Sequence, residues 1–199
     1  MTLPIYELRI SENLQDEAQV DYIALVDAPA IKKDFLAFNE NEKKITFSII
    51  SEEKRIVSGP LMLADELIYR NNEKMGEHYV KFSADTIKAI AIKFAKKKYQ
   101  NNVNLMHDPE QKVKGVTMFE SWLVDIERGI MPMKGFEGVA NGSWFGSFYV
   151  ENEKVWQSIK KGDYKGFSVE GLFDYVEPIS AEENALKKIS ELLNSIIED

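Results

Sequence analysis

Short runs with an apolar residue at every second position recur from residue 45 onward, and they constrain the fold more than any other feature. Ile45, Phe47 and Ile49 alternate with polar residues, and a Gly59-Pro60 break follows. The other candidate strands are Tyr79–Phe82, Val103–Met106, Lys114–Glu127, Ser143–Val150 and Gly166–Val176. Because successive side chains of a strand point to opposite faces, this pattern predicts several half-buried strands.

Three segments have helical rather than strand spacing. Ser83 suits the N-cap of a helix whose apolar residues recur every three or four positions, and Asn152 suits the N-cap of a shorter one closed by Gly162. Ser180 and Glu183 form a capping box before a final apolar stripe. Many strands with two or three helices predict the α+β class, either a mainly antiparallel domain or a small barrel with peripheral helices.

The chain divides into three predicted parts. Residues 1–44 are expected to be a leader or propeptide-like segment of uncertain order, residues 45–178 the core domain, and residues 179–199 a C-terminal amphipathic helix. The apolar stripe of that helix must be covered by the core or by another chain. Met1–Ile10 carries Glu7 and Arg9, unlike a signal peptide, and no apolar run approaches the ~20 residues that span a bilayer. We therefore predict no membrane partner.

Composition limits the available chemistry. The 33 acidic and 25 basic residues give a formal net charge of −8, which argues against nucleic acid as a partner. Cysteine is absent, which excludes disulfides, thiolate nucleophiles and cysteine metal sites. With only two histidines and no phosphate-binding glycine motif, no metal or cofactor is predicted. Any catalysis must rely on hydroxyls, carboxylates and at most two imidazoles.

A serine nucleophile needs a base within hydrogen-bond reach, and histidine suits that role near neutral pH. His107 lies where a predicted strand meets a proline, whereas His78 precedes an ordinary strand. Ser168 lies in a G-x-S-x-x-G segment, where alternation places it on the same face as Glu170. A lone histidine is more often a core or surface residue, and a serine between glycines is often only a small residue. These patterns alone leave open both a catalytic and a structural role for Ser168 and His107.

Glu120 interrupts the predicted apolar face of the strand Lys114–Glu127, which carries Met118 and Trp122. A carboxylate on an apolar face must be paired or hydrogen-bonded, because burying it alone is costly. It could orient a histidine as the acidic member of a triad does. A structural ion pair or a solvent-exposed edge position explains it equally well. Asp125 is a weaker candidate on the opposite face.

Several segments, in order, resemble the XkdF-type phage serine protease domain, which belongs with the prohead proteases. The likeness covers roughly residues 20–176, and the segments are VDYIALVDAPAI, KRIVSGPLMLADELIYR, HYVKFSADTI, NLMHD, ESWLVD and GFSVEGLF. Prohead proteases are similar in fold to herpesvirus assemblins, so the resemblance implies a herpesvirus-protease-like, β-barrel-like core ringed by helices. It places the histidine of the family's H-D motif at His107 and the nucleophile of its G-[LF]-S motif at Ser168.

The third catalytic residue does not follow from the motif, because assemblins use a second histidine after the serine and none follows Ser168 here. Glu120 is the predicted third member, with Asp125, Glu170 and Asp174 as alternatives. Backbone N–H groups around Gly138–Gly142 or the Arg128 side chain are candidate oxyanion donors.

The resemblance also implies substrates, location and partners. The protein is expected to cleave phage scaffold and major capsid proteins, and its own termini, during capsid maturation and virion assembly. It would act in the host bacterial cytoplasm, inside the prohead, and a homodimer is expected by analogy. The alternative is a non-enzymatic head-assembly or scaffold protein of protease ancestry.

Overall fold

The protein is described by a computed structural model over residues 3–27, 48–51 and 54–176. Within these ranges it contains twelve strands, two α-helices and one short 3-10 helix, Tyr99–Asn101. The helices are α1 (Ala84–Lys96) and α2 (Glu153–Lys161). The strands are β1 (Ile5–Arg9), β2 (Gln19–Val26), β3 (Ser48–Ser51), β4 (Ile56–Met62), β5 (Ile68–Asn72), β6 (Gly76–Lys81), β7 (Val103–Leu105), β8 (Asp108–Val113), β9 (Val116–Leu123), β10 (Trp144–Val150), β11 (Gly166–Leu172) and β12 (Asp174–Val176).

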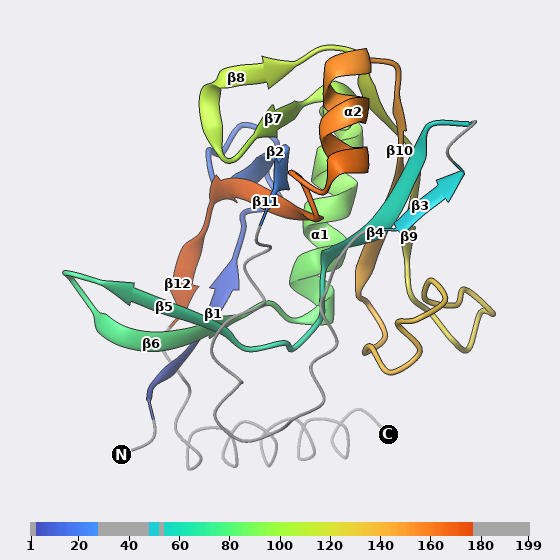
Figure 1. The fold of residues 1–199 in the computed structure, drawn as a ribbon. Coiled ribbons are helices and arrows are strands. Elements are labelled where there is room, and N and C mark those ends of the chain that lie inside the picture. The colour runs from blue at the N-terminus through green and yellow to red at the C-terminus, as the bar shows by residue number, and fades with distance from the viewer. Residues whose placement is uncertain (1–2, 28–47, 52–53, 177–199) are drawn as a thin grey trace.

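The strands form three four-stranded sheets (Figure 1). Sheet A has the order β12-β1-β6-β5, sheet B the order β11-β2-β7-β8, and sheet C the order β3-β4-β10-β9. The pairs β1–β6 and β2–β7 are parallel, and the other described pairs are antiparallel. The predicted α+β class is confirmed. The predicted barrel is not, because none of the sheets in the described part of the chain closes on itself.

Both predicted helices are present with their caps. The Ser83 side chain accepts a hydrogen bond from the Thr86 backbone N–H at the start of α1. Asn152 does the same for the N–H groups of Lys154 and Val155 at the start of α2, and Gly162 ends that helix with left-handed backbone. These side chains satisfy backbone donors that the first helical turn leaves unpaired. The predicted helix at 179–199 lies outside the described residues.

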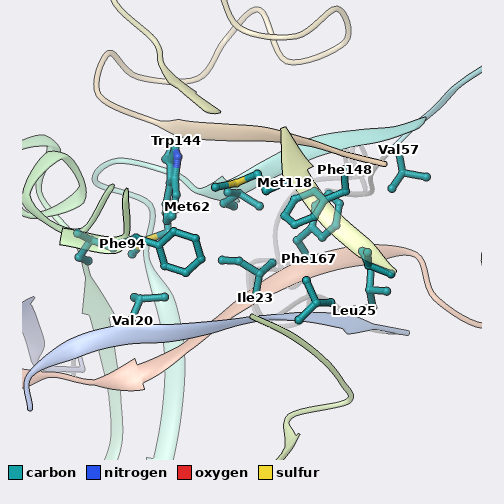
Figure 2. Packing of buried hydrophobic residues seen from close by; sticks show 14 of the residues in the cluster. Val20, Ile23, Leu25, Val57, Met62, Phe94, Met118, Trp144, Phe148 and Phe167 are labelled. Atoms are coloured by element: carbon teal, nitrogen blue, oxygen red, sulfur yellow. The ribbon is translucent and has the colours of Figure 1, made fainter. Parts of the chain in front are cut away.

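The main core lies between sheets B and C, and Figure 2 shows side chains of β2 and β11 meeting those of sheet C. The rings of Phe148 on β10 and Phe167 on β11 have centroids 4.5 Å apart. Phe94 of α1 makes an edge contact with Trp144 on β10, at 5.6 Å between centroids. Phe167 anchors β11 to this core, and its neighbour Ser168 is thereby held on the opposite face of sheet B.

Part of the segment predicted as a leader folds into these sheets. β2 lies between β11 and β7 in sheet B, and its Ile23 and Leu25 are fully buried. Lys93 of α1, only 3% exposed, donates hydrogen bonds to the backbone carbonyls of Ser11, Asp16 and Ala18. Residues 3–27 therefore supply a central strand of the sheet that carries Ser168.

Candidate functional site

A cavity of about 520 Å³ lies where the three sheets meet, along the edge strand β11. Its lining is mostly apolar, and five of its side chains carry polar or ionisable groups: Arg70, His107, Ser168, Glu170 and Tyr175. A mostly apolar pocket with a few convergent polar groups is typical of a ligand or active site. The cavity therefore brings together both residues that the resemblance places at the catalytic centre.

Ser168 occupies a row of facing residues that crosses sheet B. It pairs with Ala24 on β2, which in turn pairs with Asn104 on β7. Residues paired across strands share a face, so all three side chains lie on the side opposite Phe167 and the core. Glu170, two residues after Ser168, lies on the same face. The small Ala24 side chain leaves room for β11 and β7 side chains to meet across β2.

His107 is held by an unusual turn. Met106 and His107 form the two-residue turn between β7 and β8, and their φ angles are 54° and 59°. Hairpin turns with two positive φ angles favour Asn and Gly, and other side chains cost on the order of 1 kcal/mol each there. The Met106 N–H donates to the carbonyl of Leu25 on β2, which fastens the turn to sheet B. Backbone strain of this kind clusters at functional sites.

Proline does not end the strand at this turn as the sequence pattern suggested. Pro109 lies in β8, which continues to Val113 and pairs with β7. β8 is an edge strand of sheet B, where a residue without an N–H donor is tolerated. The hairpin therefore turns before the proline, at His107 itself.

Glu170 is the carboxylate that faces His107. Its Oε2 atom lies 3.5 Å from Nδ1 of His107, and it accepts a hydrogen bond of 2.5 Å from the Asn104 amide nitrogen. Asn104 is fully buried, so its hydrogen bond holds the Glu170 carboxylate in one position. The other amide atom, Asn104 Oδ1, has no hydrogen-bond partner among the described residues. An acceptor at Nδ1 favours the tautomer that leaves Nε2 free to take a proton.

No hydrogen bond joins Ser168 Oγ to the His107 ring in the part of the chain that is described. Both side chains are accessible, and His107 is 41% exposed. In unliganded enzymes, catalytic hydrogen bonds are often long and shorten only when substrate binds. Ser168, His107 and Glu170 therefore line one cavity, but Ser168 and His107 do not form a hydrogen bond in this structure.

Gly171, the second glycine of the serine segment, is required by close backbone packing. A Cβ atom at this position would lie 2.0 Å from the carbonyl oxygen of Gln19 on β2. The β11–β2 register shifts between Glu170 and Gly171, so a bulge falls directly beside the carboxylate that faces His107. Only glycine, which has no Cβ, fits this close approach of the β2 backbone.

Glu120, the predicted third catalytic residue, lies in sheet C and does not line the cavity. It pairs with Ser147 on β10, whereas Met118 pairs with the next residue, Phe148. Ser147 and Phe148 are adjacent and point to opposite faces, so Glu120 faces away from Met118 and the main core. A bulge at Phe119 breaks the two-residue alternation on which the prediction relied. The structure therefore does not bring Glu120 to His107, while the alternative Glu170 contacts it.

The other sequence candidates also lie elsewhere. Asp125 pairs with Arg128 at 3.6 Å, and Asp174 lies opposite Arg9 at the β12–β1 pair. The segment Gly138–Gly142 belongs to a loop whose Phe136 and Val139 pack on Phe145. Neither that segment nor Arg128 lines the cavity. The predicted oxyanion donors are thus not at the site.

His78 takes no part in the cavity. It is fully buried on β6, its Nδ1 lies 2.8 Å from the Gly76 carbonyl oxygen, and its ring makes edge contacts with both Tyr6 and Tyr175. Sequence reasoning missed Asn104 and Arg70. A polar residue inside the short apolar run Val103–Met106 was the only signal for Asn104. No local sequence pattern indicated that Arg70 lines the cavity, because its position there depends on how sheet A packs beside sheet B.

Two further findings concern ligands and membranes. No group of three or more potential metal-ligating side chains occurs among the described residues. None of the helices described is long and apolar enough to cross a bilayer.

Comparisons with known proteins point to one family. Residues 44–177, about two thirds of the chain, match the family described as "Putative phage serine protease XkdF". No curated protein and no solved structure matches the chain, so the herpesvirus-protease likeness is not confirmed. The match covers His107, Ser168 and Glu170, whereas β1 and β2 precede it. On this match, the chain belongs to the family described as "Putative phage serine protease XkdF".

Proposed function

We propose that the protein is a serine endopeptidase with Ser168 as nucleophile, His107 as general base and Glu170 as the carboxylate that orients the imidazole. The observation that carries this proposal is the contact between Glu170 and His107 Nδ1 in the same cavity as Ser168. The family match supports the reaction type. A hydroxyl, an imidazole and a carboxylate in this order are the components of serine-protease catalysis.

The mechanism follows from which atoms are free. With Nδ1 facing Glu170, Nε2 of His107 accepts the Ser168 hydroxyl proton as Oγ attacks the scissile carbonyl carbon. His107 then gives that proton to the leaving amine as the C–N bond breaks, which leaves an acyl-enzyme on Ser168. Water, deprotonated by the same imidazole, hydrolyses the ester and restores the hydroxyl. Glu170 stabilises the transient imidazolium, and Asn104 holds Glu170 in place.

The substrates we propose are peptide bonds in phage scaffold and major capsid proteins, and in the chain's own termini. Cleavage would take place in the host bacterial cytoplasm, within the immature head. The edge position of β11 supports a peptide substrate, because an extended segment can lie along an edge strand next to Ser168.

Co-expression with the phage scaffold and capsid precursors tests the proposal. The wild-type chain should trim them, and Ser168→Ala should abolish trimming while its circular dichroism spectrum and melting temperature stay unchanged. Ser147→Ala is the matched control, because Ser147 is a buried serine that bonds to Ser58 on sheet C. Processing by Ser168→Ala equal to that of the wild type would overturn the assignment. Intact precursors with the wild type would instead favour a non-enzymatic head-assembly protein.

A further inference from the structure

Arg70 differs from the other arginines in the chain. The chain contains four arginines, all within the described residues. Arg9, Arg55 and Arg128 each pair with a carboxylate, of Glu7, Glu153 and Asp125 respectively. Arg70 forms no ion pair with any described carboxylate. Its one recorded hydrogen bond runs from Nη1 to its neighbour's backbone carbonyl, Tyr69 O, at 3.0 Å.

Arg70 is an exposed residue on the wall of a mostly apolar cavity. It extends from β5 of sheet A into the cavity that holds Ser168, whose walls near it include Leu61, Ile68, Phe82 and Leu172. Partial burial lowers the pKa of Arg70, and the nearby Tyr175 opposes that shift. A guanidinium offers five N–H donors in a planar fork, and most of those on Arg70 lack an acceptor among the described residues. Because Arg70 is exposed at the cavity wall, its guanidinium is accessible to a ligand that enters the cavity.

A carboxylate is the ligand that would satisfy this group. Arginine binds carboxylates through two parallel hydrogen bonds, which are stronger and more directional than bonds between neutral groups. Glu170 does not serve, because its Oε2 atom contacts Asn104 and His107 and it forms no ion pair with Arg70. A carboxylate partner for Arg70 would therefore come from a ligand, in a cavity whose other walls suit aliphatic or aromatic side chains.

We propose that Arg70 is a specificity residue that binds an Asp or Glu side chain of the substrate peptide, next to an apolar residue that fills the cavity. This inference rests on the proposed protease function and narrows its substrate class. The protein would cleave at sites where an acidic and an apolar residue lie close to the scissile bond.

Peptide binding tests this without requiring turnover. The probes are fluorophore-labelled octapeptides of alternating Ala and Leu, with a single Glu placed at each position in turn, and a matching set with Gln. Binding to full-length Ser168→Ala is measured by fluorescence anisotropy. At one or two positions, Glu should bind about tenfold more tightly than Gln, as expected for a charge-assisted pair. Adding Arg70→Gln should reduce that ratio to about one.

Two further variants make the result specific. Arg70→Lys keeps the charge without the planar fork and should retain a smaller preference, while thermal melting checks that each variant folds. Arg128→Gln removes an arginine outside the cavity and should leave the ratio unchanged. Equal binding of Glu and Gln peptides at every position, or a preference that survives Arg70→Gln, would overturn the inference.

The protease function is judged separately on the same peptides. Wild-type cleavage that Ser168→Ala abolishes supports it, and the preferred site should then contain the Glu that binds best. A Glu preference that depends on Arg70, without cleavage by the wild type, would leave Arg70 as a carboxylate-binding residue and contradict the catalytic proposal alone.

Discussion

Glu170 Oε2 lies 3.5 Å from Nδ1 of His107, and these two residues come from the edge strand β11 and the β7–β8 turn, with β2 between those strands. The contact forms because residues on three adjacent strands of sheet B share one face. Asn104 reaches across Ala24 to hold the carboxylate. β2, which lies within the segment predicted as a leader, therefore joins the strand that carries Ser168 to the hairpin that carries His107.

Replacing Glu170 by Gln should lower kcat/KM for a cleaved substrate by about 10²-fold or more, because an amide cannot stabilise the imidazolium that forms during catalysis. Glu120→Gln is the matched control and should leave kcat/KM within twofold, since Glu120 lies in sheet C away from the cavity. Initial cleavage rates of the two variants show whether Glu170 or Glu120 supports catalysis. The opposite pattern would return the catalytic role to Glu120.

Sequence patterns predicted the caps of α1 and α2 correctly, because local spacing and capping chemistry determine them. Ser168 and His107 were assigned from the family resemblance, and both line one cavity. The pattern put Glu120 on the core-facing side of its strand because alternation assumes an unbroken strand, and the bulge at Phe119 turns Glu120 to the other face. Glu170 could be placed beside Ser168 by alternation, but its contact with His107 depends on β2, which the family match and the sequence pattern both leave outside the core. Long-range pairing of this kind cannot be read from local periodicity.

Gly171→Ala should lower the free energy of unfolding by about 1–3 kcal/mol, because the new methyl group would meet the Gln19 carbonyl oxygen and force β2 and β11 apart. Activity should fall as well, since the bulge positions Glu170. Gly138→Ala is the control, with no atom within 4 Å of its Cβ, and should change stability by at most about 1 kcal/mol. Urea denaturation measures both. Equal stability of the two variants would show that β2 and β11 can move apart at Gly171 without a loss of stability.

Lys93→Ala should destabilise the protein by about 2 kcal/mol, because three backbone carbonyls of residues 11–18 lose their shared donor. Limited proteolysis should then cut within residues 11–18 at least several times faster than in the wild type. Lys88→Ala removes an exposed lysine of the same helix and should be close to neutral. If residues 11–18 are cut at the wild-type rate in Lys93→Ala, Lys93 does not hold this segment in the fold.

Glu7 should make stability depend on pH in the acid range. Burial alone would raise the pKa of Glu7, but hydrogen bonds from Arg9 and Ser83 outweigh it and lower that pKa below its usual range. The unfolded state then binds the proton more tightly, so the contribution of Glu7 is present above about pH 4.3 and is lost as pH falls below it. The stability difference between wild type and Glu7→Gln should be about 1 kcal/mol at pH 7 and near zero at pH 2.5. Urea denaturation at both pH values measures it, and a difference that grows on acidification would contradict this assignment.

Reaction with a fluorophosphonate probe, followed by intact mass spectrometry and peptide mapping, tests the central claim most directly. The probe labels a serine only where a base activates its hydroxyl. The account predicts a single adduct on Ser168 in the wild type, slower by about 10²-fold in Glu170→Gln and by more in His107→Ala. Labelling of Ser168 by His107→Ala at the wild-type rate, or an adduct on another serine, would contradict it.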